Sequence, residues 1–432
     1  MTWATTAAAA VLAVVLPTAQ AHIGNTSQVL THFSFGSCND QAKHQMLWPT
    51  ITAQDPQLWL WLGDNIYGDV RVWDRTTLTK GVFRNASPEI LRAKYETQLN
   101  HPDYKVFRER FPTIGIWDDH DYGINDGCKT YPYRKESQQL FLDFLDEPAN
   151  SPRRQQEGIY TSYEYGTGDQ RVKFILLDNR YHKDPYGTKD GDFLGSAQWT
   201  WLEEELRSST STFNVIAVGI QVLPGDRWYN IGENWGRFPG ARTRLLDLVQ
   251  TSHASGVILL SGDIHFAEIN QVQCGDYKLT EISSSGMTHA WKVMNMRLTG
   301  VVESAFTLAN MILPWHYRVH PEQYYANFNF GNFDIDWTAS PPTATVSVLG
   351  KDGLVKLQQV IPATRYEGNR AHCGAIHEVD PTQFFLQKVL VGVVLVAFIG
   401  SVLINLVVIV VLPLQLLWRA VTGLPAAKVK RV

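Results

Sequence analysis

The stretch "FPTIGIWDDHDYG", residues 111–123, joins an apolar run to a cluster of three aspartates and one histidine. The run at 111–116 shows no polar alternation, which predicts a strand buried on both faces. Neighbouring carboxylates repel one another, so the cluster raises the free energy unless a cation or a substrate compensates for it. The stretch therefore predicts a buried strand that ends in a functional cluster.

Further apolar runs have the same character, and helical segments lie between them. The predicted strands cover residues 29–35, 57–62, 171–177, 213–222 and 256–260, and the predicted helices cover 87–100, 196–209 and 241–255. Ser87 followed by Pro88 is typical of a helix N-terminus. Strands that alternate with helices predict an α/β fold. Two alternating runs around "GKDG", residues 350–353, predict a hairpin, which favours mixed sheets over a purely parallel one.

Four of the predicted strands are followed by residues that can bind metal ions. They are Cys38 in "GSCND" (36–40), Asp64 and Tyr67 in "GDNIYGD" (63–69), Asp119 in "DDHDYG" (118–123), and Asp263 and His265 in "SGDIHFAE" (261–268). A single cluster of this kind is typical of a turn, a buried cysteine or a boundary tyrosine. Loops at the C-terminal ends of strands converge at one edge of an α/β sheet, so we expect the four clusters to meet. Their carboxylates then need positive charge between them, which arginine, lysine or metal ions can supply, and a pair of metal ions is the simplest source.

Length and charge set broad limits on the fold and the partners. The 432 residues suit one large α/β domain or two ordinary ones. The sequence shows no repeat and no long linker, so residues 22–365 are predicted to form one domain. The net charge of −4, with acidic and basic residues interspersed, gives no indication of a nucleic-acid polymer as partner. Nothing in the sequence predicts the oligomeric state.

Both ends of the chain carry apolar segments. Residues 1–21 are typical of a signal peptide, and "AQA" at 19–21 predicts cleavage before His22. Residues 384–415 are long and apolar enough for a transmembrane helix. A juxtamembrane segment, 366–383, precedes this helix, and a basic tail, 416–432, follows it. The positive-inside rule places the tail in the cytosol, which predicts a single-pass type I protein with its folded domain in the lumen or outside the cell.

Other features bear on the compartment. A GPI signal is the alternative to a transmembrane helix, but such signals end in their apolar segment, whereas this chain continues with polar and basic residues. The end "KVKRV", 428–432, resembles a dilysine retrieval signal, so the endoplasmic reticulum and the cell surface are both candidate destinations. Asn25 and Asn85 lie in glycosylation sequons, which are used only in the secretory pathway.

Taken together, the clusters resemble the motifs of the calcineurin-like metallophosphoesterase superfamily, and within it those of the PhoD-type alkaline phosphatases. The matching motifs are Ser-Cys at 37–38, Gly-Asp-x-x-Tyr at 63–67, Trp-Asp-Asp-His at 117–120 and Gly-Asp-x-His at 262–265. The stretches 176–185, 194–206 and 234–246 are similar to that family as well, so the resemblance covers residues 31–350. It implies an α/β/β/α sandwich of two mixed sheets.

The resemblance implies two neighbouring metal sites that share the carboxylate of Asp64. The first site would be completed by Cys38, Tyr67 and His265. A thiolate and a phenolate suit Fe³⁺, as in purple acid phosphatases. The second site would be formed by Asp119 and Asp263. Its oxygen ligands suit Ca²⁺, Mg²⁺ or Mn²⁺. The superfamily usually has asparagine and histidine at these last two positions, and the difference disfavours zinc.

The same resemblance assigns roles to four further residues. Gln221 in "VGIQ", 218–221, stands where many relatives have a metal-binding histidine, and its carbonyl oxygen again favours a hard ion. His120 would donate a hydrogen bond to phosphate and support charge in the transition state. Arg180 and His182 are candidate phosphate contacts, since arginine offers a planar bidentate donor set. The alternative for these two residues is a surface salt bridge.

With Cys38 assigned to a metal, three cysteines remain. We predict a disulfide between Cys274 and Cys373, which suits an oxidising compartment and leaves Cys128 free. The competing arrangement pairs Cys38 with Cys128 and removes the thiolate from the metal.

The activity implied is metal-dependent hydrolysis of phosphate esters, as in an alkaline phosphatase. The metals would lower the pKa of bound water from 15.7 to roughly 7 and so supply hydroxide as nucleophile. No Gly-x-Ser-x-Gly or P-loop pattern is present, consistent with a reaction that needs no protein nucleophile. One alternative is a phosphodiesterase acting on lipid headgroups or nucleotides. Another is a catalytically silent receptor, which the presence of Asp64, Asp119, Asp263 and His265 disfavours.

Overall fold

The computed structural model describes residues 23–73, 81–225, 233–291, 316–368 and 371–376, with scattered positions between 382 and 418. One compact unit comprises residues 1–302 and 317–376. A second unit, residues 303–316 and 377–432, lies almost wholly outside the described residues. All elements given below belong to the first unit.

The two predicted terminal segments are not part of this description. The signal peptide, residues 1–21, lies outside the described residues, and so does most of the transmembrane region predicted at 384–415. Among the residues that are described, no helix is both long and apolar enough to cross a membrane.

The first sheet has the strand order β15-β14-β13-β1-β2-β5. The strands are β1 (His32–Gly36), β2 (Trp59–Leu62), β5 (Thr113–Ile116), β13 (Asn329–Asp336), β14 (Thr343–Gly350) and β15 (Val355–Pro362). Strands β1, β2 and β5 are parallel, whereas β13, β14 and β15 pair antiparallel. The sheet is therefore mixed, and the predicted hairpin at 350–353 joins β14 to β15.

The second sheet has the order β12-β10-β11-β9-β8-β7-β6, and β16 pairs with β10. Its strands are β6 (Thr161–Thr167), β7 (Gln170–Leu176), β8 (Phe213–Val218), β9 (Val257–Ser261), β10 (Ala267–Cys274), β11 (Tyr277–Ser284), β12 (Tyr324–Tyr325) and β16 (Cys373–Ala375). Strands β7, β8, β9 and β11 are parallel, and the remaining pairings are antiparallel. Two mixed sheets were predicted and are confirmed. A separate hairpin consists of β3 (Val70–Trp73) and β4 (Gly81–Arg84).

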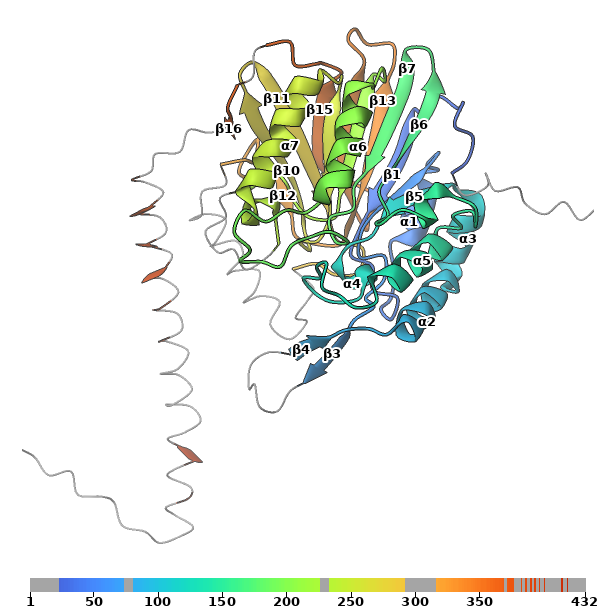
Figure 1. Ribbon diagram of the computed structural model, residues 1–432, viewed down its shortest axis with the longest axis vertical. Coiled ribbons are helices and arrows are strands. Elements are labelled where there is room, and N and C mark those ends of the chain that lie inside the picture. The colour runs from blue at the N-terminus through green and yellow to red at the C-terminus, as the bar shows by residue number, and fades with distance from the viewer. Residues whose placement is uncertain are drawn as a thin grey trace, which may run out of the picture. The chain divides into compact units, whose positions relative to one another are not determined.

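The two sheets pack face to face. Successive residues of a strand point to opposite faces of its sheet, so one set of side chains meets the other sheet and the next set meets the helices. On β7, the ring of Phe174 lies 5.0 Å from that of Phe33 on β1 of the other sheet. The next residue, Ile175, belongs instead to an apolar cluster with α6 (Gly195–Arg207) and α7 (Pro239–Ser252). These two helices cover the outer face of the second sheet, as Figure 1 shows.

Helices also cover the outer face of the first sheet. Trp48 of α1 (Trp48–Ala53) lies 5.4 Å from Trp59 of β2, and Phe107 of α3 (Pro102–Arg110) lies 5.7 Å from the same ring. The remaining helical elements are α2 (Pro88–Leu99), α4 (Asp119–Tyr122), α5 (Arg134–Phe144) and two 3₁₀ turns at Pro152–Arg154 and Trp235–Arg237. The layers are therefore helix, sheet, sheet and helix.

For the elements that were predicted, local signals in the sequence placed the starts to within about three residues. The Ser87 side chain accepts a hydrogen bond from Ile90 N, and Pro88 is the first residue of α2, as predicted. Strand β8 ends at Val218, earlier than the predicted end at residue 222. The chain leaves the sheet at Gly219, where an added Cβ would lie 2.3 Å from Asp118 Oδ1. The absence of a side chain at this glycine lets the backbone approach the polar cluster.

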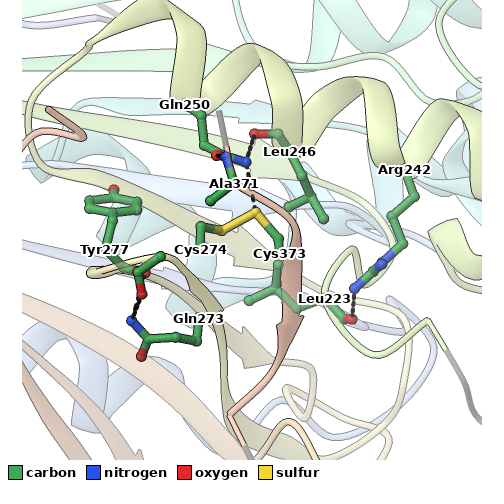
Figure 2. Close-up of a disulfide and its surroundings, with 10 residues drawn as sticks. Leu223, Arg242, Leu246, Gln250, Gln273, Cys274, Tyr277, Ala371 and Cys373 are labelled. Carbon is green, nitrogen blue, oxygen red and sulfur yellow. Dashed lines mark hydrogen bonds between the residues drawn. A yellow bond between two sulfur atoms is a disulfide. The ribbon is translucent and has the colours of Figure 1, made fainter. Parts of the chain in front are cut away.

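The disulfide joins the last strand of the unit to the second sheet. Cys373 of β16 lies opposite Cys274 of β10, and the two sulfurs are bonded (Figure 2). The predicted pairing is confirmed. Cys38 and Cys128 are free, so the competing pairing does not form. The folded unit continues to residue 376, past the boundary predicted at 365, because β16 and the disulfide hold this segment on β10.

Candidate metal centre

The predicted ligands come together between the C-terminal ends of the two sheets. Cys38, Asp64 and Asp119 follow β1, β2 and β5 of the first sheet, whereas Asp263 and His265 follow β9 of the second. The expectation that all four clusters share one sheet edge was wrong. Face-to-face packing aligns the ends of both sheets, so each sheet contributes one side of the centre.

The backbone is strained at four of these residues. Cys38, Asp64, Asp263 and His265 have φ angles of 62°, 50°, 70° and 58°, in the left-handed region. This conformation is uncommon for residues other than glycine and tends to cluster at functional sites. The sharp turns bring the side chains toward one another directly after each strand.

The first donor group consists of Cys38, Asp64 and His265. One ligand atom of each lies within 4.8 Å of the others, and Cys38 Sγ lies 3.4 Å from Asp64 Oδ2. The hydroxyl of Tyr67 lies 3.0 Å from His265 Nε2. The group thus combines sulfur, carboxylate and imidazole donors, with the phenol beside them.

The second donor group shares Asp64 with the first. It contains Asp64, Asp118, Asp119 and Asp263, again with ligand atoms within 4.8 Å of one another. All the donors in this second group are oxygen atoms. The resemblance implied two neighbouring sites that share Asp64, and the second group adds Asp118 to the ligands that it implied.

Burial and mutual repulsion perturb the pKa values of these groups. Burial, together with the charge of Asp119, raises the pKa of Asp64 well above its ordinary value. Burial and the charge of Asp118 raise the pKa of Asp263 in the same way. Burial and the charge of Asp64 raise the pKa of the Cys38 thiol. Cations placed among these donors would stabilise the charged forms. The donor set therefore fits metal ions.

His120 lies beside the donors as a cation. Its Nδ1 lies 2.8 Å from Asp69 Oδ1, and its backbone N–H donates to Asp119 Oδ1 at 2.9 Å. Burial alone would lower its pKa, but the charges of Asp119 and Asp69 outweigh burial and raise it to about 10. Nδ1 is held by Asp69, and a ring nitrogen of His120 also forms a donor group with Asp64 and Asp119, whose ligand atoms lie within 4.8 Å of one another.

Arg180 is fully buried in an ion-pair network, which differs from the surface salt bridge considered above. Its Nε donates to Asp118 Oδ1 at 2.6 Å, and Nη1 lies 2.5 Å from Glu233 Oε2. Lys183 Nζ lies 3.2 Å from the other oxygen of Glu233. Within the described part of the chain, Arg180 Nη2 has no hydrogen-bond partner.

His182 lies in a different environment. Its Nε2 lies 3.8 Å from the half-exposed Glu157, and its ring packs against Tyr181. The structure does not bring His182 into either donor group.

Gln221 is fully buried with a fixed orientation. Its Nε2 donates to Glu268 Oε1 at 2.7 Å and to Ser283 Oγ at 2.8 Å. No described residue donates to its Oε1. The two bonds to the nitrogen leave the carbonyl oxygen as the atom that is available to a ligand.

Comparison with known families places this geometry in context. The family described as PhoD-like phosphatase matches residues 33–344. The chain belongs to the PhoD-like phosphatase family. Alkaline phosphatase D of Bacillus subtilis (strain 168) is 24% identical over 54% of this chain and 45% of its own length. The chain thus matches less than half the length of that relative.

A solved structure gives the same relationship at the level of the fold. The structure of PhoD aligns with 84% of this chain and 76% of its own chain, with a TM-score of 0.54 and 17% identity. At this identity the similarity concerns the fold.

Three residues of this PhoD-like centre were given no role from the sequence. Ser285 Oγ lies 2.9 Å from Cys38 Sγ, and Asp69 holds His120. The ring of His289 stacks on Tyr67 at 4.3 Å. Asp69 lies in the "GDNIYGD" motif, which was a usable signal. Ser285 and His289 follow β11, for which the sequence predicted no strand.

The buried network of this PhoD-like chain predicts a stability effect. Glu233→Gln should lower the free energy of unfolding of chelator-treated protein by about 3–5 kcal/mol, because it removes the carboxylate partner of the buried Lys183 and one of the two carboxylate partners of Arg180. Denaturant unfolding followed by tryptophan fluorescence measures this. Glu203→Gln breaks the exposed pair with Arg207 and should cost less than about 1 kcal/mol. Equal costs for the two variants would contradict the role assigned to the network.

Proposed function

We propose that this protein hydrolyses phosphate esters at the candidate metal centre, as an alkaline-phosphatase-like phosphomonoesterase. The observation that carries the proposal is the shared carboxylate of Asp64, which belongs to both donor groups. When bound, two metal ions would polarise the phosphoryl oxygens and lower the pKa of water enough to supply hydroxide as the nucleophile. Membership of the PhoD-like phosphatase family supports the same reaction class.

The donors differ between the two groups, which supports different ions. Cys38, Tyr67 and His265 with Asp64 would hold Fe³⁺, because thiolate and phenolate are strong donors to a ferric ion. Asp119 and Asp263, with the carbonyl oxygen of Gln221, would hold Ca²⁺, Mg²⁺ or Mn²⁺.

The remaining residues would bind and orient the phosphoryl group. His120 would donate from Nε2 to a phosphoryl oxygen, with Asp69 fixing its ring. Arg180 would contribute through Nη2, since its other donors are engaged by Asp118 and Glu233. His182 would need to break its contact with Glu157 to reach the phosphoryl group, so we assign it a weaker contact with the phosphoryl group than that of Arg180.

We propose that the domain works on the lumenal or extracellular side of a membrane in the secretory pathway. The apolar segments at 1–21 and 384–415 and the basic residues at 416–432 support a type I topology. The disulfide suits an oxidising compartment. Asn25 and Asn85, the sequon residues, are both exposed, as glycosylation requires.

Metal removal tests the proposed reaction. Exhaustive chelation should abolish turnover of p-nitrophenyl phosphate, and iron together with Ca²⁺, Mg²⁺ or Mn²⁺ should restore it. Metal analysis of the active protein should find roughly one iron ion per chain. Full activity after chelation would refute the metal-dependent reaction. Full activity in iron-free protein would refute only the assignment of Cys38 and Tyr67 to Fe³⁺.

A further inference from the structure

Among the residues that the structure describes, the donors of the metal centre differ in exposure, which indicates the side from which a ligand enters. Cys38, Asp64 and Asp119 are at most 3% exposed. Tyr67 and His265 are partly exposed, as is His289. A ligand therefore reaches the buried donors past these three rings, and side chains beside the rings contact it first.

Two segments are tied together at this opening. Thr288 N donates to Cys38 O at 3.0 Å, and Asp40 N donates to Thr288 Oγ1 at 2.6 Å. These bonds join the loop after β1 to the segment after β11. They fix the relative positions of Lys43 on the first segment and His289 on the second.

Lys43 places a positive charge at the opening. Its ammonium contacts His289 Nε2, and the His289 ring stacks on Tyr67 at 4.3 Å and on His265 at 5.1 Å. Its nearest carboxylate oxygen, Asp40 Oδ2, is 3.9 Å away, beyond hydrogen-bond distance. An ammonium has three N–H donors, so two remain after the contact with the imidazole.

Two cations that the structure describes among the donors are placed differently. Arg180 is fully buried and paired with Asp118 and Glu233. His120 is 7% exposed and paired with Asp69. The Lys43 side chain is 44% exposed, so Lys43 can meet an anion at the opening without breaking a buried ion pair.

We propose that Lys43, held by His289, is a specificity-determining residue that binds the doubly charged phosphoryl group of a monoester at the opening of the metal centre. The inference rests on the proposed phosphoester hydrolysis and makes it more specific. A monoester phosphate carries close to two negative charges above its second pKa of about 6, whereas a diester carries one. A cation at the opening therefore favours the monoester over the diester.

Kinetics and direct binding on the full-length protein test this proposal. Lys43→Met should raise the KM for p-nitrophenyl phosphate about tenfold, and the KM for bis-p-nitrophenyl phosphate only about threefold, because the lost attraction scales with ligand charge. The Kd for inorganic phosphate, measured by calorimetry, should rise by a factor similar to that for the monoester. Lys43→Arg keeps the charge and should recover most of both losses.

The controls separate binding from structure and from the reaction itself. Lys351→Met removes the same charge from the exposed turn between β14 and β15 and should leave both KM values unchanged. An unchanged Kd for inorganic phosphate in Lys43→Met would overturn the proposal. So would an equal rise in KM for both esters together with an altered metal content. A wild-type protein that turns over neither ester would refute the proposed function, while weaker phosphate binding in Lys43→Met would still support the role of Lys43.

Discussion

Asp64→Asn should lower kcat for p-nitrophenyl phosphate by more than about 100-fold. Loss of a residue that only hydrogen-bonds to a metal ligand costs at most about that factor. Asp64 belongs to both donor groups, and its Oδ2 lies 3.4 Å from Cys38 Sγ. An amide keeps the size of the side chain but removes the negative charge that two cations would share. The loss should therefore affect both metal positions at once, and metal analysis should find less of both ions.

Asp352→Asn is the matched control for this variant. Asp352 lies in the exposed turn between β14 and β15, where it pairs with Lys356. The same chemical change there should leave kcat and metal content at the wild-type level. Near wild-type turnover by Asp64→Asn, with a circular dichroism spectrum equal to that of the control, would refute a centre built on this carboxylate.

Removal of the disulfide should give a large loss of stability. Cys274 and Cys373 are 99 residues apart, so the bond closes a long loop in the unfolded chain. The double variant Cys274→Ser/Cys373→Ser should lower the free energy of unfolding by about 3–5 kcal/mol, because the unfolded state regains the entropy that the bond removed. Denaturant unfolding in the absence of reductant measures this difference.

Cys128→Ser is the control, since Cys128 is free and only partly buried. It should change the free energy of unfolding by less than about 0.5 kcal/mol. At low denaturant, the double variant should keep its activity, because the disulfide lies on β10 and β16 rather than in either donor group. A double variant as stable as wild type would show that the pairing of β16 with β10 holds this segment without the bond.

Short-range sequence signals predicted the elements that carry the ligands. The run before Asp118 forms β5, and Ser87 caps α2 as expected. These features depend on neighbouring residues, so a single sequence contains them. The pairing of Cys274 with Cys373 was also predicted, from the assignment of Cys38 to a metal.

Long-range features were harder to predict because they depend on residues far apart in the chain. Strands β10 and β11 were missed, although they pair with each other over eight residues. Their polar residues, such as Glu268 and Glu281, are buried and bonded inside the fold, which hides the apolar pattern of a core strand. Ser285 and His289 follow β11, so they were missed with it.

By itself, the sequence determined which residue types stand at the strand ends, and hence that donors for metal ions would gather there. The local run of apolar residues before each cluster was enough for that, because strand formation and turn chemistry are set over a few residues. Only the tertiary structure decided that Asp263 and His265 come from a second sheet. It also decided that Arg180 forms an ion pair with Glu233 and that Lys43 lies beside His289 at the centre. Those placements follow from the packing of two sheets face to face, which no local pattern encodes.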